Sequence, residues 1–215
     1  MTAIAARISN HQLNVWRAEL SNWKDASEFR SRVDNIVHSI PRRTFFQQAG
    51  LTFLRDAWIA GRVATALSTE RVRLIPQERP DFETVRAGKV KQFEATEADI
   101  NGRRRGDEPD DLSLVQDPVE KWRKRFEAIP AALERVIAKK LKKHYSADVG
   151  LVIYVNLGCY GAYLDEGLPI LRDRTAPAKD KFRDVFAMWE GTLYKLWENG
   201  KFVTEQWHYA ELDDF

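Results

Sequence analysis

The chain of 215 residues predicts an α/β fold, with a helical N-terminal part, a central region of strands and helices, and antiparallel C-terminal strands. Apolar residues recur at helical spacing in residues 12–37, an alternating pattern at 81–96 is typical of a hairpin, and residues 150–156 are almost continuously apolar. A hydrophobic content of 44% is enough to bury one sizeable core and hardly two. We therefore expect a single domain over residues 1–215.

The N-terminal part, residues 1–45, is predicted to be a helical preface. Residues 12–37 carry large apolar side chains at three- and four-residue spacings, which predicts one or two amphipathic helices that end at Pro41. The same periodicity returns in residues 51–67 and predicts a further helix. Residues 71–75 then alternate as a short strand.

Residues 81–85 and 89–96 predict two strands joined by a tight turn at Ala87-Gly88. Because alternate side chains of a strand share a face, Asp81 on the first strand and Glu94 on the second can lie together. Opposed carboxylates on neighbouring strands suit Mg²⁺ or Mn²⁺, which prefer oxygen ligands and leave positions for water and a phosphate. The hairpin therefore predicts a site for a divalent cation.

A polar segment without periodicity, residues 98–117, predicts a long loop that contains Arg103, Arg104 and Arg105. Residues 118–144 then predict a long helix, in which Pro130 should cause a kink or a break.

The remaining elements follow from short apolar runs and turn residues. Residues 150–156 predict a strand buried on both faces. A short helix is expected within residues 175–184. The C-terminal strands are expected at 186–189, 193–197 and 202–207, with turns at Glu190-Gly191 and Asn199-Gly200.

The order helix, three strands, long helix, strand over residues 51–156 resembles the common core of the PD-(D/E)xK nuclease superfamily. That resemblance implies a restriction-endonuclease-like fold, with a mixed central sheet flanked by helices, and leaves residues 186–209 as a C-terminal strand extension. It also implies that Asp81, Glu94 and the Ala95 carbonyl bind Mg²⁺ or Mn²⁺. Thr96 stands where the family has its lysine, and a hydroxyl lacks the fixed positive charge that would activate water.

The activity implied by the resemblance is metal-dependent hydrolysis of phosphodiester bonds in nucleic acid, in DNA rather than RNA. Thr96 and Glu97 are then expected to orient the attacking water. Many relatives contribute an acidic residue from the preceding helix, and Asp56 is the candidate, although an Asp beside an Arg is more commonly an exposed charge. The candidates for holding the phosphate backbone are Arg103, Arg104, Arg105, Lys121 and Lys124.

The replacement of the motif lysine leaves three alternatives open. Positive charge is supplied from elsewhere, by Arg103, Arg104 or Lys121; or Glu97 positions water or a second metal; or the site is degenerate and the chain is a nucleic-acid-binding or assembly subunit. A different class of protein is a structural interaction protein, in which Asp81, Glu94 and the arginines form only an ion-pair network.

Other functional classes have no anchor in the sequence. The four His residues and the single Cys show no zinc-ligand spacing, and no Walker-type loop or nucleophile elbow is present. The net charge of +2 gives little general attraction to nucleic acid. With one cysteine and no long apolar segment, we expect a cytoplasmic protein without a membrane partner, which acts as a homodimer or in a larger complex if it cleaves both strands of a duplex.

Overall fold

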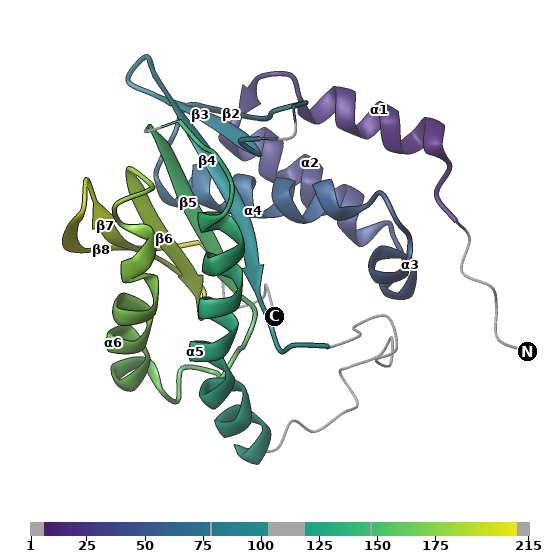
Figure 1. Ribbon diagram of the computed structural model, residues 1–215. Helices are drawn as coiled ribbons and strands as arrows, with labels where there is room; N and C mark the ends of the chain where they lie inside the picture. Colours follow the sequence, from purple (N-terminus) through teal and green to yellow (C-terminus); the bar gives the residue numbers. More distant parts are fainter. Residues whose placement is uncertain (1–6, 78, 103–118, 147, 210–215) are drawn as a thin grey trace, which may run out of the picture.

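The computed structural model describes residues 7–77, 79–102, 119–146 and 148–209. A mixed β-sheet of eight strands, in the spatial order β1 to β8, is flanked by helices on both faces (Figure 1). The strands are β1 (Lys24–Asp25), β2 (Arg71–Leu74), β3 (Phe82–Arg86), β4 (Lys89–Ala98), β5 (Val149–Val155), β6 (Asp184–Trp189), β7 (Thr192–Glu198) and β8 (Lys201–His208). The helices are α1 (Asn10–Leu20), α2 (Ala26–His38), α3 (Arg42–Gln47), α4 (Thr52–Ala66), α5 (Val119–Leu141), α6 (Leu164–Thr175) and the short 3₁₀ helix η2 (Ala176–Ala178).

The type of strand pairing changes twice across the sheet. Strands β1 to β4 pair antiparallel, β4, β5 and β6 pair parallel, and β6 to β8 pair antiparallel again. Parallel neighbours need a crossover connection, and α5 and α6 provide the two crossovers. The C-terminal strands extend this same sheet, because β6 pairs with β5 through Val152 and Phe186.

The helices form two layers that cover opposite faces of the sheet (Figure 1). One core packs α1, α2 and α4 against Phe82, Phe93 and Val152, and the other packs α5 and α6 against Leu151 and Ile153. Val152 and Ile153 are neighbours on β5 that serve opposite cores, and both are fully buried. This double burial explains the continuous apolar run of β5 and confirms the strand predicted there.

The N-terminal helices confirm the periodicity found in the sequence. The pattern over residues 12–37 resolves into α1 and α2, and the pattern over residues 51–67 corresponds to α4. None of the helices in the described part of the chain is long and apolar enough to cross a membrane.

Helix α5 is unbroken through Pro130, so of the two expected effects, a kink or a break, the break is wrong. A proline removes one intrahelical hydrogen bond and crowds the preceding turn. Ile129 and Leu133, on either side of Pro130, are both fully buried in the core beneath the helix. Packing of this apolar stripe holds both halves of α5 against the sheet.

Helix α6 was not expected, because Gly167 and Pro169 lie inside it and both disfavour a helix interior. A Cβ atom on Gly167 would lie 2.3 Å from ring atoms of Trp189, so the helix approaches the sheet where only glycine fits. The short helix predicted within residues 175–184 corresponds to the 3₁₀ helix η2, which has Pro177 in its first turn.

The predicted hairpin turns are confirmed by their backbone angles. Asn199 has φ 48° and Gly200 has φ 76°, and the pair Glu190 and Gly191 is similar at 49° and 71°. Positive φ at both central residues is what a type I′ turn requires.

The long loop predicted at residues 98–117 lies largely outside the described residues, together with Arg103, Arg104 and Arg105.

Candidate functional site

Three carboxylates, of Asp56, Asp81 and Glu94, lie near one another: besides burial, the negative charge of Glu94 raises the pKa of both Asp56 and Asp81. Asp81 immediately precedes β3, and its backbone N–H donates to the carbonyl of Phe93 at 2.9 Å. The register of the pair places Asp81 opposite Glu94, as expected from the hairpin. Asp56 reaches the same region from α4.

Asp81 is fixed against the neighbouring strand. Its Oδ2 accepts a hydrogen bond from the backbone N–H of Ala95 at 2.7 Å. Burial, reinforced by the negative charges of Asp56 and Glu94, raises the pKa of Asp81 to about 7. Near neutral pH this carboxyl group is therefore poised between its two protonation states.

Glu94 is almost fully buried, at 2% exposed, and only one of its carboxylate oxygens is satisfied. Oε1 accepts hydrogen bonds from Lys140 Nζ at 2.5 Å and from the Tyr145 hydroxyl at 3.0 Å. Within the described residues Oε2 has no hydrogen-bond partner. A buried, unpaired carboxylate oxygen is costly unless a donor or a cation meets it.

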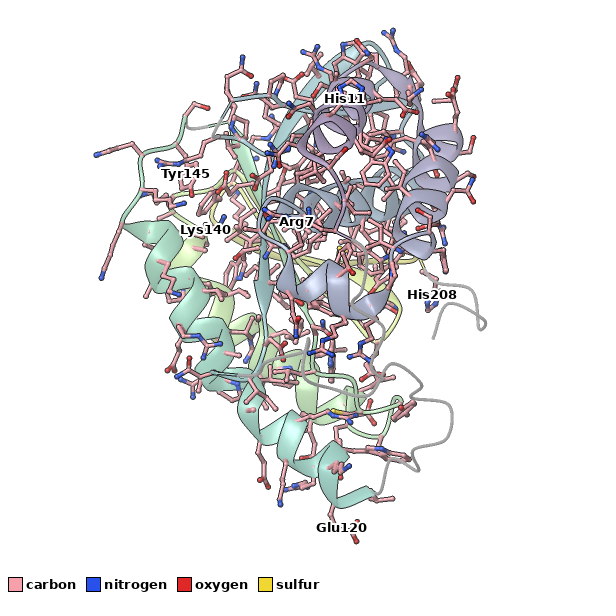
Figure 2. The ribbon with its side chains drawn as sticks, turned by 90° about the vertical axis from the view of Figure 1, so that its right-hand side faces the viewer. Arg7, His11, Glu120, Lys140, Tyr145 and His208 are labelled. Carbon is pink, nitrogen blue, oxygen red and sulfur yellow. The ribbon has the colours of Figure 1, made fainter. Side chains whose placement is uncertain are left out.

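Lys140 supplies a positive charge beside the motif. Its ammonium group donates to Glu94 Oε1 and also, at 2.7 Å, to the carbonyl of Ala95. Lys140 comes from the last turn of α5, and Figure 2 shows it beside Tyr145 at that end of the helix. The ammonium thus contacts two of the groups that the resemblance assigns to the metal.

Sequence reasoning missed Lys140, because it lies 46 residues after Glu94 and belongs to no recognised motif. Buried positions of α5 include Ile129, Leu133, Val136 and Ile137, and a further step of three or four residues leads to Lys140. A lysine that continues an apolar stripe was the available signal. Its side chain is only 13% exposed.

An Asp beside an Arg is commonly an exposed charge, but Asp56 is mostly buried. Its side chain is 17% exposed and accepts from Arg55 Nη2 at 2.8 Å. Burial raises the pKa of Asp56, and the positive charge of Arg55 partly opposes that effect. The structure therefore adds a third, mostly buried carboxylate to the pair on the hairpin.

Thr96 and Glu97 are separated by the alternation of β4. Thr96 lies opposite Ile153 of β5 and is partly buried. Glu97 points to the other face, where its Oε1 accepts from Asn156 Nδ2 at 2.8 Å and its Oε2 lies 3.9 Å from Arg55 Nη1. The structure does not bring Glu97 together with Asp81 and Glu94.

Lys121 and Lys124 are exposed at the N-terminal end of α5. At 1.5 Å per residue, Lys124 lies about 24 Å along the helix from Lys140. Figure 2 shows Glu120, which precedes Lys121 in the chain, at the opposite end of α5 from Lys140. These two lysines are therefore not brought to the carboxylates.

The donor chemistry of the site suits a hard divalent cation, since its side-chain groups are carboxylates and one buried oxygen of Glu94 is unsatisfied. In the described residues, however, no three His, Cys, Asp or Glu side chains are grouped closely enough to hold a metal ion. Lys140 instead neutralises part of the negative charge.

Comparison of this chain with protein-family models, with curated proteins and with solved structures finds no match.

Proposed function

We propose that this protein is a metal-dependent nuclease with a restriction-endonuclease-like core, in which Lys140 provides the charge that Thr96 lacks. The observation that carries the proposal is the contact of one ammonium group with both Glu94 Oε1 and the Ala95 carbonyl. The order α4, β2, β3, β4, α5, β5, with β4 and β5 parallel, is compatible with such a core.

Asp81 and Glu94 would be the first ligands of Mg²⁺ or Mn²⁺, with Glu94 Oε2 as the oxygen that has no hydrogen-bond partner among the described residues. Asp56 would complete the set only if the three side chains moved closer together around the ion. When bound, the ion would polarise a phosphate and lower the pKa of a water molecule. Asp81, whose pKa is near 7, can hold a proton until the ion binds. The ion would also compete with the ammonium of Lys140 for Glu94.

Lys140 has the chemistry needed to act on a phosphodiester. An ammonium group fixed by Glu94 and the Ala95 carbonyl has three donors, of which two are used in these contacts. The third can contact the attacking water or a phosphate oxygen and stabilise developing negative charge. Burial raises the pKa of Tyr145, so its hydroxyl stays protonated and keeps donating to Glu94.

The test is cleavage of labelled single- and double-stranded DNA and RNA in Mg²⁺, in Mn²⁺ and in EDTA. Lys140→Met is compared with Lys139→Met, which removes an equal charge from the adjacent exposed position. We expect metal-dependent cleavage by the wild type and Lys139→Met, and a loss of about a hundredfold or more in Lys140→Met. Glu94→Gln should be similarly inactive.

Full cleavage by Lys140→Met would refute the role of this lysine. A second candidate function is a non-catalytic nucleic-acid-binding or assembly subunit, and the neutralisation of Glu94 by Lys140 favours it. Salt-sensitive binding of these substrates, without cleavage of any of them by the wild type, would support that function instead.

A further inference from the structure

A cavity of about 530 Å³ lies on the α4 side of the sheet, next to the carboxylates but separate from them. Its walls come from the end of α2, from α3 and α4, and from residues at the C-terminal ends of β4 and β5. Cavities of roughly 300–1,000 Å³ are typical of small-molecule sites. The space is therefore large enough for one flat heterocycle.

The walls of this cavity are rich in aromatic rings, contributed by Phe45, Phe46, Trp58 and Tyr154. Trp58 and Tyr154 contact each other with ring centroids 5.0 Å apart, and Trp58 is also covered by the guanidinium of Arg62 at 4.0 Å. These contacts restrain the rings before any ligand arrives. Rings held in this way offer stacking surfaces to a nucleobase.

One part of the lining is polar and combines an acceptor with a donor. Glu97 presents a carboxylate that Asn156 Nδ2 holds at 2.8 Å, and Arg55 Nη1 lies 3.9 Å from the other oxygen. A carboxylate can accept two adjacent N–H donors, and a guanidinium can donate to a carbonyl oxygen. The Watson–Crick edge of guanine has such a pair of N–H groups beside a carbonyl.

Arg55 connects this cavity to the carboxylates. Its guanidinium lines the cavity and also donates to Asp56 at 2.8 Å. Along β4, Glu97 is three residues beyond Glu94, a distance of about 10 Å at the usual strand rise. A base stacked in a duplex cannot enter a cavity of this kind, whereas an unpaired or flipped base can.

We propose that this cavity receives an unpaired nucleobase, guanine by preference, from the strand whose phosphodiester lies at Asp81 and Glu94. The proposal rests on the proposed nuclease function and specifies its substrate as a strand with an accessible base. Tyr154 and Trp58 stack on the base, and Glu97 and Arg55 select its edge.

The test measures binding by fluorescence anisotropy in EDTA, so that metal-dependent cleavage does not interfere. The probes are labelled five-residue DNA strands that are abasic except for one central guanine, adenine, cytosine or thymine, with a fully abasic strand as the reference. We expect the guanine strand to bind about tenfold more tightly than the abasic strand, the range that stacking on an aromatic side chain provides. The affinities for the adenine, cytosine and thymine strands should lie between these two values.

Two variants identify the cavity as the source of this preference. In Tyr154→Leu, the guanine strand and the abasic strand should bind with nearly equal affinity. In Glu97→Gln, the affinity for the guanine strand should fall to the affinity for the adenine strand. The control is Phe202→Leu, which removes a partly exposed ring from β8 at the far edge of the sheet. It should change neither the guanine-to-abasic nor the guanine-to-adenine ratio of affinities. Circular dichroism of each variant verifies that it is folded.

Equal binding of the guanine and abasic strands by the wild type, or a guanine preference that survives Tyr154→Leu, would overturn the proposal. The cleavage assay separates this failure from failure of the nuclease function. Cleavage without a base preference would support the nuclease function and refute the base site. A base preference that requires Tyr154, without cleavage, would support the base site and refute the nuclease function.

Discussion

At the scale of single residues, the candidate site combines carboxylates in unequal environments. Glu94 has a cation and a hydroxyl group on Oε1, whereas Asp81 has a backbone N–H and two negative neighbours. Negative charge that is buried without full compensation lowers stability, and a bound cation can compensate it.

Asp81→Asn should stabilise the protein in a pH-dependent way. The pKa of Asp81 rises from 3.8 to about 7 on folding, so the wild type loses stability as the pH increases through that window. Asn removes this loss and can still accept from the Ala95 N–H. We expect no advantage below about pH 4 and a gain of about 2 kcal/mol at pH 8, half of the ceiling set by 1.36 kcal/mol per pKa unit.

Urea unfolding in EDTA between pH 4 and pH 8 measures this effect. Asp173→Asn is the matched control, because Asp173 is exposed and its pKa is lowered by the hydrogen bond from Arg172. A gain in Asp81→Asn that is the same at pH 4 and pH 8 would show that the carboxyl group does not carry the penalty.

Lys140→Met should destabilise the protein in the absence of metal. Removing one partner of a buried ion pair leaves the other charge uncompensated, which typically costs 3–5 kcal/mol, and we expect about 3 kcal/mol here because Tyr145 still donates to Glu94. Lys139→Met should change stability by less than about 0.5 kcal/mol. Thermal unfolding in EDTA compares the two variants.

Adding Mg²⁺ should restore part of the stability of Lys140→Met, since a ligand that binds only the folded state raises its stability by mass action. Equal stability of Lys140→Met and Lys139→Met in EDTA would mean that the Glu94 contact contributes nothing to folding.

At the scale of elements, close packing can outweigh intrinsic propensity. Helix α6 contains Gly167 because the ring of Trp189 occupies the space where a side chain would begin. That ring is fully buried, and its Nε1–H donates to the carbonyl of Leu157 at 3.2 Å, so it has little freedom to move.

Gly167→Ala tests this balance between packing and propensity. Helix propensity alone predicts a gain of about 1 kcal/mol. A Cβ atom 2.3 Å from the Trp189 ring instead forces the helix or the ring to move, and overpacking of this kind costs about 1–3 kcal/mol. We therefore expect a net loss of about 2 kcal/mol by chemical denaturation.

The control for this substitution is Gly158→Ala. A Cβ atom on Gly158 would lie 3.9 Å from the nearest side-chain atom, Oε1 of Glu190, which is ordinary van der Waals contact. This variant should remain within about 0.5 kcal/mol of the wild type. Stabilisation by Gly167→Ala would contradict the close approach of α6 to the sheet.

At the scale of the whole molecule, a single sheet connects two cores. Val152 packs with α1, α2 and α4, whereas Ile153 packs with α5 and α6. Because these neighbours belong to the same strand, loss of either core removes half of the packing that holds β5.

Val152→Ala and Ile153→Ala should therefore lower one common unfolding transition. Truncation of large buried side chains costs about 2–5 kcal/mol, and Ile153→Ala should be the more severe because it removes more volume. Urea unfolding followed by tryptophan fluorescence and by circular dichroism should give coincident curves with unchanged slope. Two separate transitions in either variant would show that the cores unfold independently.

The sequence by itself determined the elements that depend on local pattern: the N-terminal helices, the hairpin that sets Asp81 opposite Glu94, the buried strand β5 and the C-terminal turns. Periodicity and turn chemistry act over a few residues, so they can be read from neighbouring positions. Only the tertiary structure decided that α5 continues through Pro130, that α6 forms around Gly167, and that Lys140 meets Glu94 from 46 residues away. These outcomes depend on which surfaces pack together after the chain crosses the sheet. Local spacing can place Lys140 on the buried side of its helix, but it does not identify Glu94 as its partner.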